Sequence, residues 1–364
     1  MMINLSKSLE KCDILTIAGT RPEVIKLSEL VKQLNHYRHV YAYTGQHYSE
    51  NMKDIFFDEL DSSSDIDLCC NTSDIEIIKY KIIDLISKIK PSLMIVYGDT
   101  NSSLAGALAA TETKTKLIHI EAGLRSFDMR MPEERNRIKI DRLADYLFCP
   151  TTLSREYLRF EGIKENVFVT GNLIVDVCQK FARLDLKARN NFDEDFILLT
   201  LHRAENVDDI NALKILVIRL KEISHCKIIF PIHPRTKKNL EVNKIELPQN
   251  VITIDPVGYL DFLSLLKKTK LVLTDSGGVQ EEAIILGKPC ITLRHTTERS
   301  ESILMGANRL YPLLQNSEDF VSVVDEMLNI QVRDHPYGKS VTFKTVNIIK
   351  NIILQPSVKI HHQV

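Results

Sequence analysis

The sequence predicts an α/β protein made of two Rossmann-like, doubly wound domains that face each other across a cleft. At 364 residues, the chain is longer than a single hydrophobic core usually supports. Short apolar runs alternate with amphipathic stretches along most of it. The runs are continuously apolar, as expected for parallel strands whose two faces are both covered by helices.

The first half of the chain contains one complete βα array. Strands are expected at residues 13–18, 40–44, 93–97, 116–120, 146–149 and 167–169. Helices are expected at residues 24–34, 75–89, 102–111, 133–145 and 152–160. Residues 61–74 have loop composition and no clear period.

A second βα array follows the polar, charge-mixed segment 185–195, which we interpret as a linker. Strands are expected at residues 196–201, 227–232, 251–254, 271–274 and 290–293. Helices are expected at residues 210–223, after Gly278, at 259–268 and at 318–328. The predicted domains are therefore residues 1–184 and 185–340, followed by a last helix near 341–354 whose pattern suits either domain.

Composition excludes several functional classes. The 47 Lys and Arg residues nearly balance the 48 Asp and Glu residues, for a net charge of −1, which disfavours a nucleic-acid binder. No apolar run reaches the length of a membrane helix, and residues 1–11 lack the apolar stretch of a secretion signal. We expect a cytoplasmic protein with no membrane or nucleic-acid partner.

Seven cysteines are scattered along the chain without a CxxC pair. The odd number and the spacing disfavour a disulfide framework and a thiolate zinc site. We interpret these side chains as small hydrophobic residues in a reducing compartment.

The first predicted strand ends in Gly19-Thr20-Arg21-Pro22-Glu23, and Lys26 follows on the next helix. A tight turn before a helix N-terminus favours anions, and Arg21 and Lys26 would add positive charge. A simple turn with a solvated arginine is the alternative. The segment is neither a P-loop nor a GxGxxG fingerprint, so a P-loop ATPase or a nicotinamide enzyme is disfavoured and no cofactor is expected.

Three acidic residues follow strands or open a helix in the first domain, namely Asp99, Glu121 and Glu133. Because the carboxyl ends of parallel strands meet at one sheet edge, these carboxylates are candidates for general acid–base catalysis. The alternative makes Asp99 a helix cap and Glu133 a first-turn residue that interacts with the helix dipole.

Two histidine–arginine pairs end successive strands of the second domain, His202-Arg203 and His233 with Arg235. Such pairs suit a diphosphate clamp, in which histidine donates and arginine binds in a fork. A zinc site is disfavoured because no HExxH-type spacing is present.

The most specific segment is Thr274-Asp275-Ser276-Gly277-Gly278, which ends a strand and opens a helix. Its backbone N–H groups could hold phosphate oxygens. Glu282, one turn further on, could accept two ribose hydroxyls, and Arg299 could supply another phosphate contact. A plain capped helix is the alternative, although it would not need two glycines.

The chain resembles the non-hydrolysing UDP-N-acetylglucosamine 2-epimerases. The resemblance rests on ordered motifs from about Ile14 to the last helix. They are GTRPEVIKLSELV, TGQHYSENM, GDTNSSLAGALAA, HIEAGLRSFD, MPEERNR, TGNLIVD, LTLHRAENVD, PIHPRTKK and TDSGGVQEEAIILGKPCITLR…TTER.

This resemblance implies a glycosyltransferase-B-like fold with the last helix, within residues 341–364, crossing back to the first domain. It implies interconversion of UDP-N-acetylglucosamine and UDP-N-acetylmannosamine without metal or nicotinamide, by a homodimer. The implied catalytic residues are Asp99, Glu121, Glu133 and His202, and the implied substrate-binding residues are Arg21, Lys26, Ser276, Gly277, Gly278, Glu282 and Arg299.

The chain departs from the family pattern at two places. Residues 65–74 are shorter than the Gly/Ser-rich loop of relatives, although Gln46 and His47 are retained. The resemblance implies that in bacterial relatives this region takes part in allosteric activation by a second UDP-N-acetylglucosamine. The shorter segment puts such control in doubt here. The segment Arg294-His295-Thr296-Thr297-Glu298-Arg299-Ser300-Glu301 replaces the usual RDxTERPE.

Four alternatives stay open. The first is a 2-epimerase of UDP-2,3-diacetamido-glucuronate, whose members tend to read GARPQ where this chain has Thr20 and Glu23. The others are a hydrolysing epimerase, a glycosyltransferase of the same fold and a non-catalytic UDP-sugar sensor.

Overall fold

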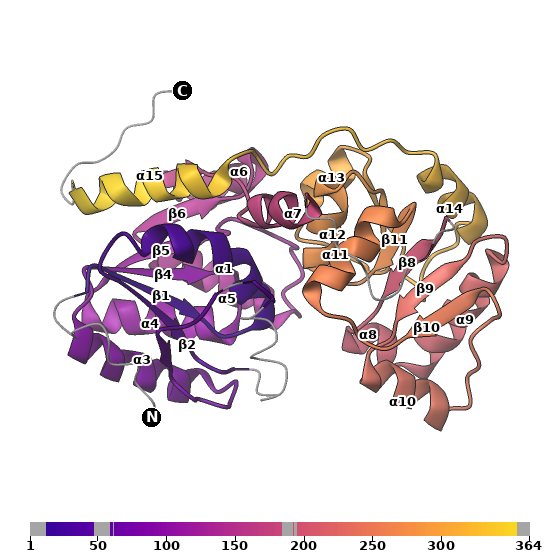
Figure 1. The fold of residues 1–364 in the computed structure, drawn as a ribbon, viewed down its shortest axis with the longest axis horizontal. Helices are drawn as coiled ribbons and strands as arrows, with labels where there is room; N and C mark the ends of the chain where they lie inside the picture. Colours follow the sequence, from indigo (N-terminus) through magenta and orange to yellow (C-terminus); the bar gives the residue numbers. More distant parts are fainter. Residues whose placement is uncertain (1–11, 47–58, 61, 184–191, 193–194, 355–364) are drawn as a thin grey trace. The chain divides into compact units, whose positions relative to one another are not determined.

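The computed structural model describes residues 12–46, 59–60, 62–183, 192 and 195–354. The chain divides into two compact units. Unit 1 consists of Met1–Val177 with Tyr337–Val364, and unit 2 of Cys178–Pro336. Each unit contains one parallel sheet with helices packed around it (Figure 1).

The sheet of unit 1 has the strand order β3-β2-β1-β4-β5-β6-β7. Its strands are β1 (Ile14–Ala18), β2 (His39–Tyr43), β3 (Ile66–Asp67), β4 (Leu93–Tyr97), β5 (Lys116–Ile120), β6 (Tyr146–Cys149) and β7 (Val167–Val169). The order changes direction between β1 and β4, which defines a doubly wound sheet whose ligand side is the carboxyl edge.

Helices cover both faces of this sheet. They are α1 (Arg21–Leu34), α3 (Ile75–Ile89), α4 (Asn101–Thr113), α5 (Pro132–Leu143), α6 (Thr152–Phe160) and α15 (Val341–Leu354). The helix α7 (Ile174–Ala182) begins in unit 1 and ends in unit 2. Helix α4 packs against α3 and α5, whereas α15 lies beside α1 on the other face (Figure 1). The last helix of the chain therefore completes the layer that α1 begins.

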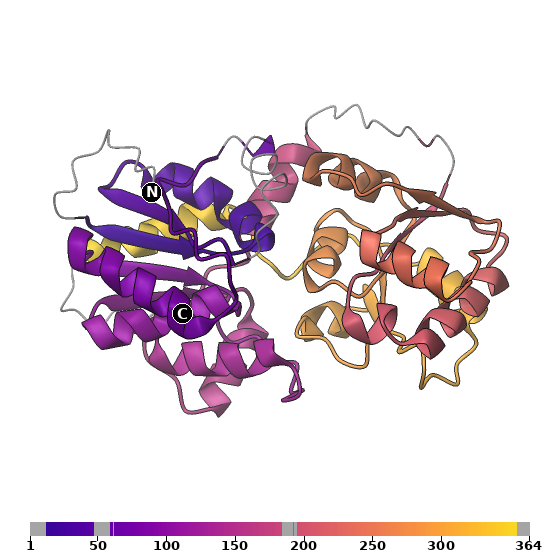
Figure 2. The ribbon, with the colours of Figure 1, turned by 90° about the horizontal axis from the view of Figure 1, so that it is seen from below.

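The sheet of unit 2 has the order β10-β9-β8-β11-β12-β13. Its strands are β8 (Ile197–Thr200), β9 (Ile228–Pro231), β10 (Val251–Ile254), β11 (Leu271–Thr274), β12 (Cys290–Thr292) and β13 (Asn308–Leu310). Its helices are α8 (Ala204–Val207), α9 (Ile210–Glu222), α10 (Pro234–Val242), α11 (Tyr259–Lys268), α12 (Gly277–Ile285), α13 (Ser300–Leu304) and α14 (Phe320–Leu328). Figure 2 shows helices on both faces of this sheet as well.

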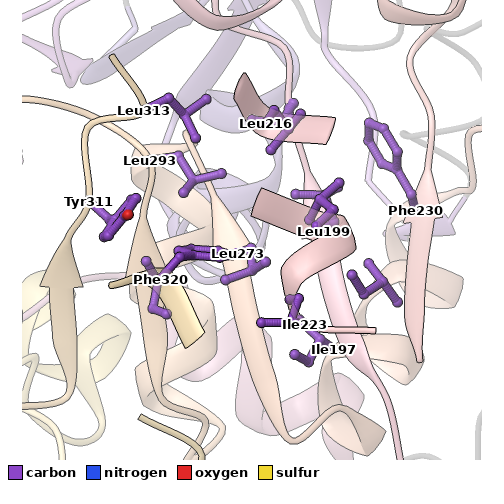
Figure 3. Packing of buried hydrophobic residues seen from close by; sticks show 14 of the residues in the cluster. Ile197, Leu199, Leu216, Ile223, Phe230, Leu273, Leu293, Tyr311, Leu313 and Phe320 are labelled. Carbon is purple, nitrogen blue, oxygen red and sulfur yellow. The ribbon is translucent and has the colours of Figure 1, made fainter. Parts of the chain in front are cut away.

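The core of unit 2 lies between its sheet and the layer formed by α9 and α14. Leu199, Leu273 and Phe230 project from three strands toward Leu216 of α9 and Phe320 of α14 (Figure 3). Burial of such side chains contributes about 1.5–3 kcal/mol each. This packing fixes the strands whose carboxyl ends carry the polar residues of interest.

The predicted class of two parallel α/β sheets is confirmed. Residues 61–74 are not entirely loop, because Ile66–Asp67 forms the edge strand β3. The sequence patterns also missed α7, α8, α10, α13 and β13. Most of these elements are short, and α10 is largely polar. No helix among the described residues is both long and apolar enough to cross a membrane.

Candidate functional site

The carboxyl edge of the unit 1 sheet gathers the first set of predicted residues. Strands β1, β4 and β5 are neighbours, with Ile17 paired to Val96 and Val96 paired to His119. The turns that follow these three strands carry Thr20, Asp99 and Glu121. The register thus places three segments far apart in sequence at one edge.

Glu121 is held in an unusual backbone conformation directly after β5. Its φ of 72° lies in the left-handed region, which is uncommon for a residue with a side chain. Its buried carboxylate accepts hydrogen bonds from Lys26 Nζ at 2.6 Å and from the Tyr97 hydroxyl at 2.7 Å. The Lys26 ammonium also lies 5.3 Å from the centre of the Tyr97 ring. The surrounding structure therefore aims this carboxylate and compensates its charge.

Asp99 is paired with an arginine that the sequence patterns did not single out. Two nitrogens of the Arg137 guanidinium donate to Asp99 Oδ2. Asn136 fixes the same turn by donating to the Asp99 carbonyl at 3.0 Å. The helix beginning after Asp99 is capped by Thr100, so the alternative of Asp99 as a helix cap is wrong.

The adjacent Glu133 and Glu134 of α5 have different surroundings. Glu134 is completely buried, accepts from Ser126 and lies 2.6 Å from Arg137 Nη1. It therefore anchors Arg137, the guanidinium that pairs with Asp99. Glu133 is half-buried and precedes Arg137 by one helical turn, so both project from a similar face of α5.

Glu23 connects the turn after β1 to the start of α4. Its Oε2 accepts from the Gly19 and Thr20 N–H groups at 2.8 and 2.7 Å, and its Oε1 accepts from Thr100 and Ser103 at 2.7 Å. Burial raises the pKa of Glu23, while these hydrogen bonds oppose the shift. Arg21 opens α1 from the same turn.

Of Gln46 and His47, the two residues considered for allosteric regulation, the structure describes only Gln46. The Gln46 side-chain oxygen accepts from the Ser102 N–H at 2.9 Å and from its hydroxyl at 2.8 Å, which ties the end of the segment after β2 to α4. His47 lies outside the described residues.

A buried network stiffens the turns around Asp99 and Glu121. His119 contacts Asp141 at 2.7 Å through Nδ1 and the Gly98 carbonyl at 2.8 Å through Nε2. Asp141 also accepts from Gly123 and, at 2.7 Å, from Arg125. One histidine thus holds the residue before Asp99, and its partner holds the segment after Glu121.

In unit 2, the turn between β11 and α12 has the features of an anion site. Ser276 caps α12 by accepting from the Val279 N–H at 3.5 Å. A Cβ on Gly277 would lie 2.5 Å from Glu298 Oε1, whereas a Cβ on Gly278 would meet no atom within 4 Å. A side chain at the first glycine would displace the buried, ion-paired Glu298 carboxylate, and the second glycine leaves space beside the helix N-terminus.

Charged residues surround this turn. Arg299 is buried and donates to Glu281 at 2.8 Å and to Glu298 at 2.9 Å. Glu282 is also buried. Burial, followed by the Glu282 carboxylate, raises the pKa of Tyr259. The acidic partners fix the guanidinium near the N-terminus of α12.

His202 and Arg203 follow β8, the strand beside β11. Asp275 Oδ1 lies 3.0 Å from His202 Nδ1, and Asp275 Oδ2 accepts from the Arg203 N–H at 2.9 Å. Burial would raise the pKa of Asp275, but the His202 ring and the Arg203 N–H outweigh it and hold this pKa below its ordinary value. The His202 side chain itself remains about half exposed, at 51%.

The second histidine–arginine pair is arranged differently. His233 caps α10 by accepting from the Arg235 N–H at 3.2 Å, and the Arg235 side chain pairs with Asp208. Burial, then repulsion from His202 and Arg235, lowers the pKa of His233. His233 therefore lies near His202, whereas Arg235 is already neutralised by a carboxylate.

No group of three or more potential metal-ligating His, Cys, Asp or Glu side chains occurs in the part of the chain that the structure describes. Asp99, Glu121 and Glu298 are instead paired with arginine or lysine side chains. The local chemistry is that of carboxylates and cations arranged for proton transfer and anion binding.

Comparison with known proteins agrees with this chemistry. Residues 29–352 match the model of the UDP-N-acetylglucosamine 2-epimerase family. The chain belongs to this family. The UDP-N-acetylglucosamine 2-epimerase of Methanocaldococcus jannaschii is 45% identical over 337 residues, covering 86% of this chain and 91% of that protein.

The name of another relative gives a different sugar as its substrate. The UDP-2,3-diacetamido-2,3-dideoxy-D-glucuronate 2-epimerase of Pseudomonas aeruginosa is 44% identical over 311 residues, covering 82% of this chain and 87% of that protein. Identity to the two proteins is almost equal, so identity alone does not select the sugar.

A solved structure extends the likeness to the fold. The M. jannaschii epimerase in complex with UDP-N-acetylglucosamine and UDP has a TM-score of 0.85 at 42% identity, covering 93% of this chain and 99% of that one. The predicted resemblance and the glycosyltransferase-B-like fold class are confirmed.

Proposed function

We propose that the chain is a non-hydrolysing 2-epimerase that interconverts UDP-N-acetylglucosamine and UDP-N-acetylmannosamine. Family membership and the paired arrangement of Glu121 with Lys26 and Tyr97 support this proposal. The second support is the anion-binding turn at Ser276, Gly277 and Gly278. The reaction requires both a carboxylate and a site for a diphosphate.

The chemistry explains why both sets are needed. The hydrogen on the second sugar carbon is not adjacent to a carbonyl, so its direct removal would give an unstabilised carbanion. Breaking the bond between the anomeric carbon and the UDP oxygen first gives that carbon oxocarbenium character, which acidifies the neighbouring hydrogen. A carboxylate then takes this proton, leaving 2-acetamidoglucal and UDP.

Addition completes the reaction. UDP returns to the anomeric carbon while a proton is delivered to the second carbon from the opposite face, so no atom is gained or lost. Asp99, Glu121 and Glu133 are the proposed acid–base residues, and Lys26 and Arg21 bind the sugar nucleotide beside them.

Unit 2 would stabilise the departing diphosphate. Backbone N–H groups at the start of α12 and Arg299 bind phosphate oxygens, and Glu282 accepts from the ribose hydroxyls. His202, with Arg203 and His233 nearby, donates to the charge that develops as the sugar–oxygen bond breaks.

The identity of the substrate sugar can be tested by supplying UDP-N-acetylglucosamine and UDP-2,3-diacetamido-glucuronate separately and comparing the kcat/KM values. The expected preference for the former derives from Thr20 and Glu23, whose hydrogen-bonded turn differs from the GARPQ reading of the second group. A higher kcat/KM for the glucuronate would assign the P. aeruginosa activity instead. Release of free N-acetylmannosamine, rather than its UDP form, would indicate the hydrolysing reaction.

We also propose a cytoplasmic homodimer. All seven cysteines are free thiols, which supports a reducing compartment. Exposed apolar side chains on α3, among them Ile77 and Tyr80, support a contact between two copies of the chain. Light scattering after gel filtration measures the mass in solution, and a monomer would contradict the dimer.

A further inference from the structure

The buried carboxylate of Asp275 stands between two functional turns of unit 2. It follows β11 directly and precedes Ser276 of the anion-binding turn, and it contacts the turn after β8. The pairing of Thr274 with Thr200 aligns the ends of these strands, so Asp275 and His202 emerge at the same edge.

Four donors converge on this carboxylate. The backbone N–H groups of His202 and Arg203 lie at 3.2 and 2.9 Å, and Asn206 Nδ2 at 3.2 Å. The fourth is the His202 ring, whose Nδ1 lies 3.0 Å from Oδ1. Backbone and Asn206 contacts alone would hold the turn, so the ring contact is an additional feature.

This contact determines which ring nitrogen is protonated. Asp275 is completely buried, and its donors hold its pKa below the ordinary value, so at neutral pH the carboxylate can only accept. Nδ1 must then carry a hydrogen. Nε2 is then the nitrogen left to meet a ligand, on a side chain that is about half exposed.

We propose that Asp275 is a positioning residue that fixes the Nδ1–H tautomer and the orientation of His202, directing Nε2 toward the leaving diphosphate. The proposal rests on the proposed function for the target of Nε2, but the tautomer itself does not depend on it. The physical logic is that of a carboxylate that orients a catalytic imidazole and stabilises its charged form.

The decisive measurement is the 15N spectrum of the His202 ring in the full-length protein, assigned by comparison with His202→Asn. In the wild type at neutral pH we expect Nδ1 protonated, against the preference of a solvated neutral imidazole for Nε2–H. In Asp275→Asn we expect the Nδ1 signal to change toward the Nε2–H form. A wild-type ring carrying its hydrogen on Nε2 alone would overturn the proposal, as would an unchanged tautomer in the variant.

Kinetics separates positioning from a general structural role. Asp275→Asn should lower kcat about 10²–10⁴-fold. The double variant Asp275→Asn/His202→Asn should be no slower than His202→Asn alone, because Asp275 acts through that ring. Multiplying losses would contradict the proposal.

Thr269→Val provides the matched control. Thr269 is also completely buried in unit 2, and its hydroxyl donates to the Phe196 and Leu271 carbonyls at 2.9 and 2.8 Å. This variant should lose stability without changing kcat or the His202 spectrum. If the wild type has the Nδ1–H tautomer but no epimerase activity, the proposed function fails while the Asp275–His202 pairing stands.

Discussion

Lys26 Nζ and Glu121 Oε2 lie 2.6 Å apart although the residues are 95 positions apart in sequence. Both side chains are more than nine-tenths buried, with exposures of 7% and 6%. The pair joins α1 to the turn after β5 and places a compensated carboxylate at the edge of the sheet.

Replacing Lys26 by Met should affect both folding and catalysis. Breaking a buried ion pair leaves an uncompensated charge, which costs about 3–5 kcal/mol of unfolding free energy. Turnover should fall as well, because Glu121 loses its orientation. Denaturant unfolding and steady-state kinetics measure the two effects.

Lys88→Met is the control for that substitution. Lys88 lies at the same 2.6 Å from Asp84, but both side chains are about half exposed. Because solvent screens the two charges, such a pair contributes little to the free energy of unfolding. Equal destabilisation by the two variants would show that burial of the Lys26 pair has no energetic consequence.

Glu121→Gln and Asp99→Asn should each lower kcat by roughly two to four orders of magnitude, the usual effect of removing an acid–base group. UDP affinity, measured by calorimetry, should hardly change because the groups proposed to bind the diphosphate and the ribose are on unit 2. Asp128→Asn is a suitable control, since Asp128 forms its ion pair with the exposed Arg130. Near-normal turnover in both active-site variants would remove these residues from catalysis.

The two glycines of the anion-binding turn should respond differently to alanine. Gly277→Ala should destabilise unit 2, because its new Cβ would lie 2.5 Å from Glu298 Oε1. Gly278→Ala adds a methyl group where no atom lies within 4 Å, so folding should be unaffected while UDP binding weakens. Unchanged UDP affinity in Gly278→Ala would place the phosphates elsewhere.

Glu301 should make stability depend on pH. Burial raises its pKa to about 7, well above that of an unfolded glutamate. The folded state therefore keeps a proton that the unfolded state has lost, and this group's contribution to stability falls as pH rises from about 4.5 to 7. Glu301→Gln should be more stable than the wild type at pH 8, by roughly 1–3 kcal/mol, and similar to it at pH 4.5. A difference independent of pH would contradict this assignment.

The sequence was sufficient to predict the long apolar elements. Strands such as Leu93–Tyr97 and helices such as Ile75–Ile89 have the ranges expected, because burial on both faces or on one stripe leaves a clear periodicity. The two-residue strand β3 has no such signal, since only its pairing with β2 defines it.

The strand, turn and helix around Ser276–Gly278 could be predicted because the motif is local in sequence. The candidate site was not predictable where partners come from distant segments. Arg137 is 38 residues from Asp99, and Asp275 is 73 from the His202 backbone it accepts from. Strand register and helix packing bring these residues together, and a local sequence pattern predicts neither of them.

The most direct test of the proposed chemistry is epimerisation of UDP-N-acetylglucosamine in heavy water, followed by NMR of the UDP-sugars. Because the second-carbon hydrogen leaves on a carboxylate that exchanges with solvent, the manno product should carry deuterium at that carbon. Product formed with the original hydrogen fully retained would contradict elimination and re-addition of UDP.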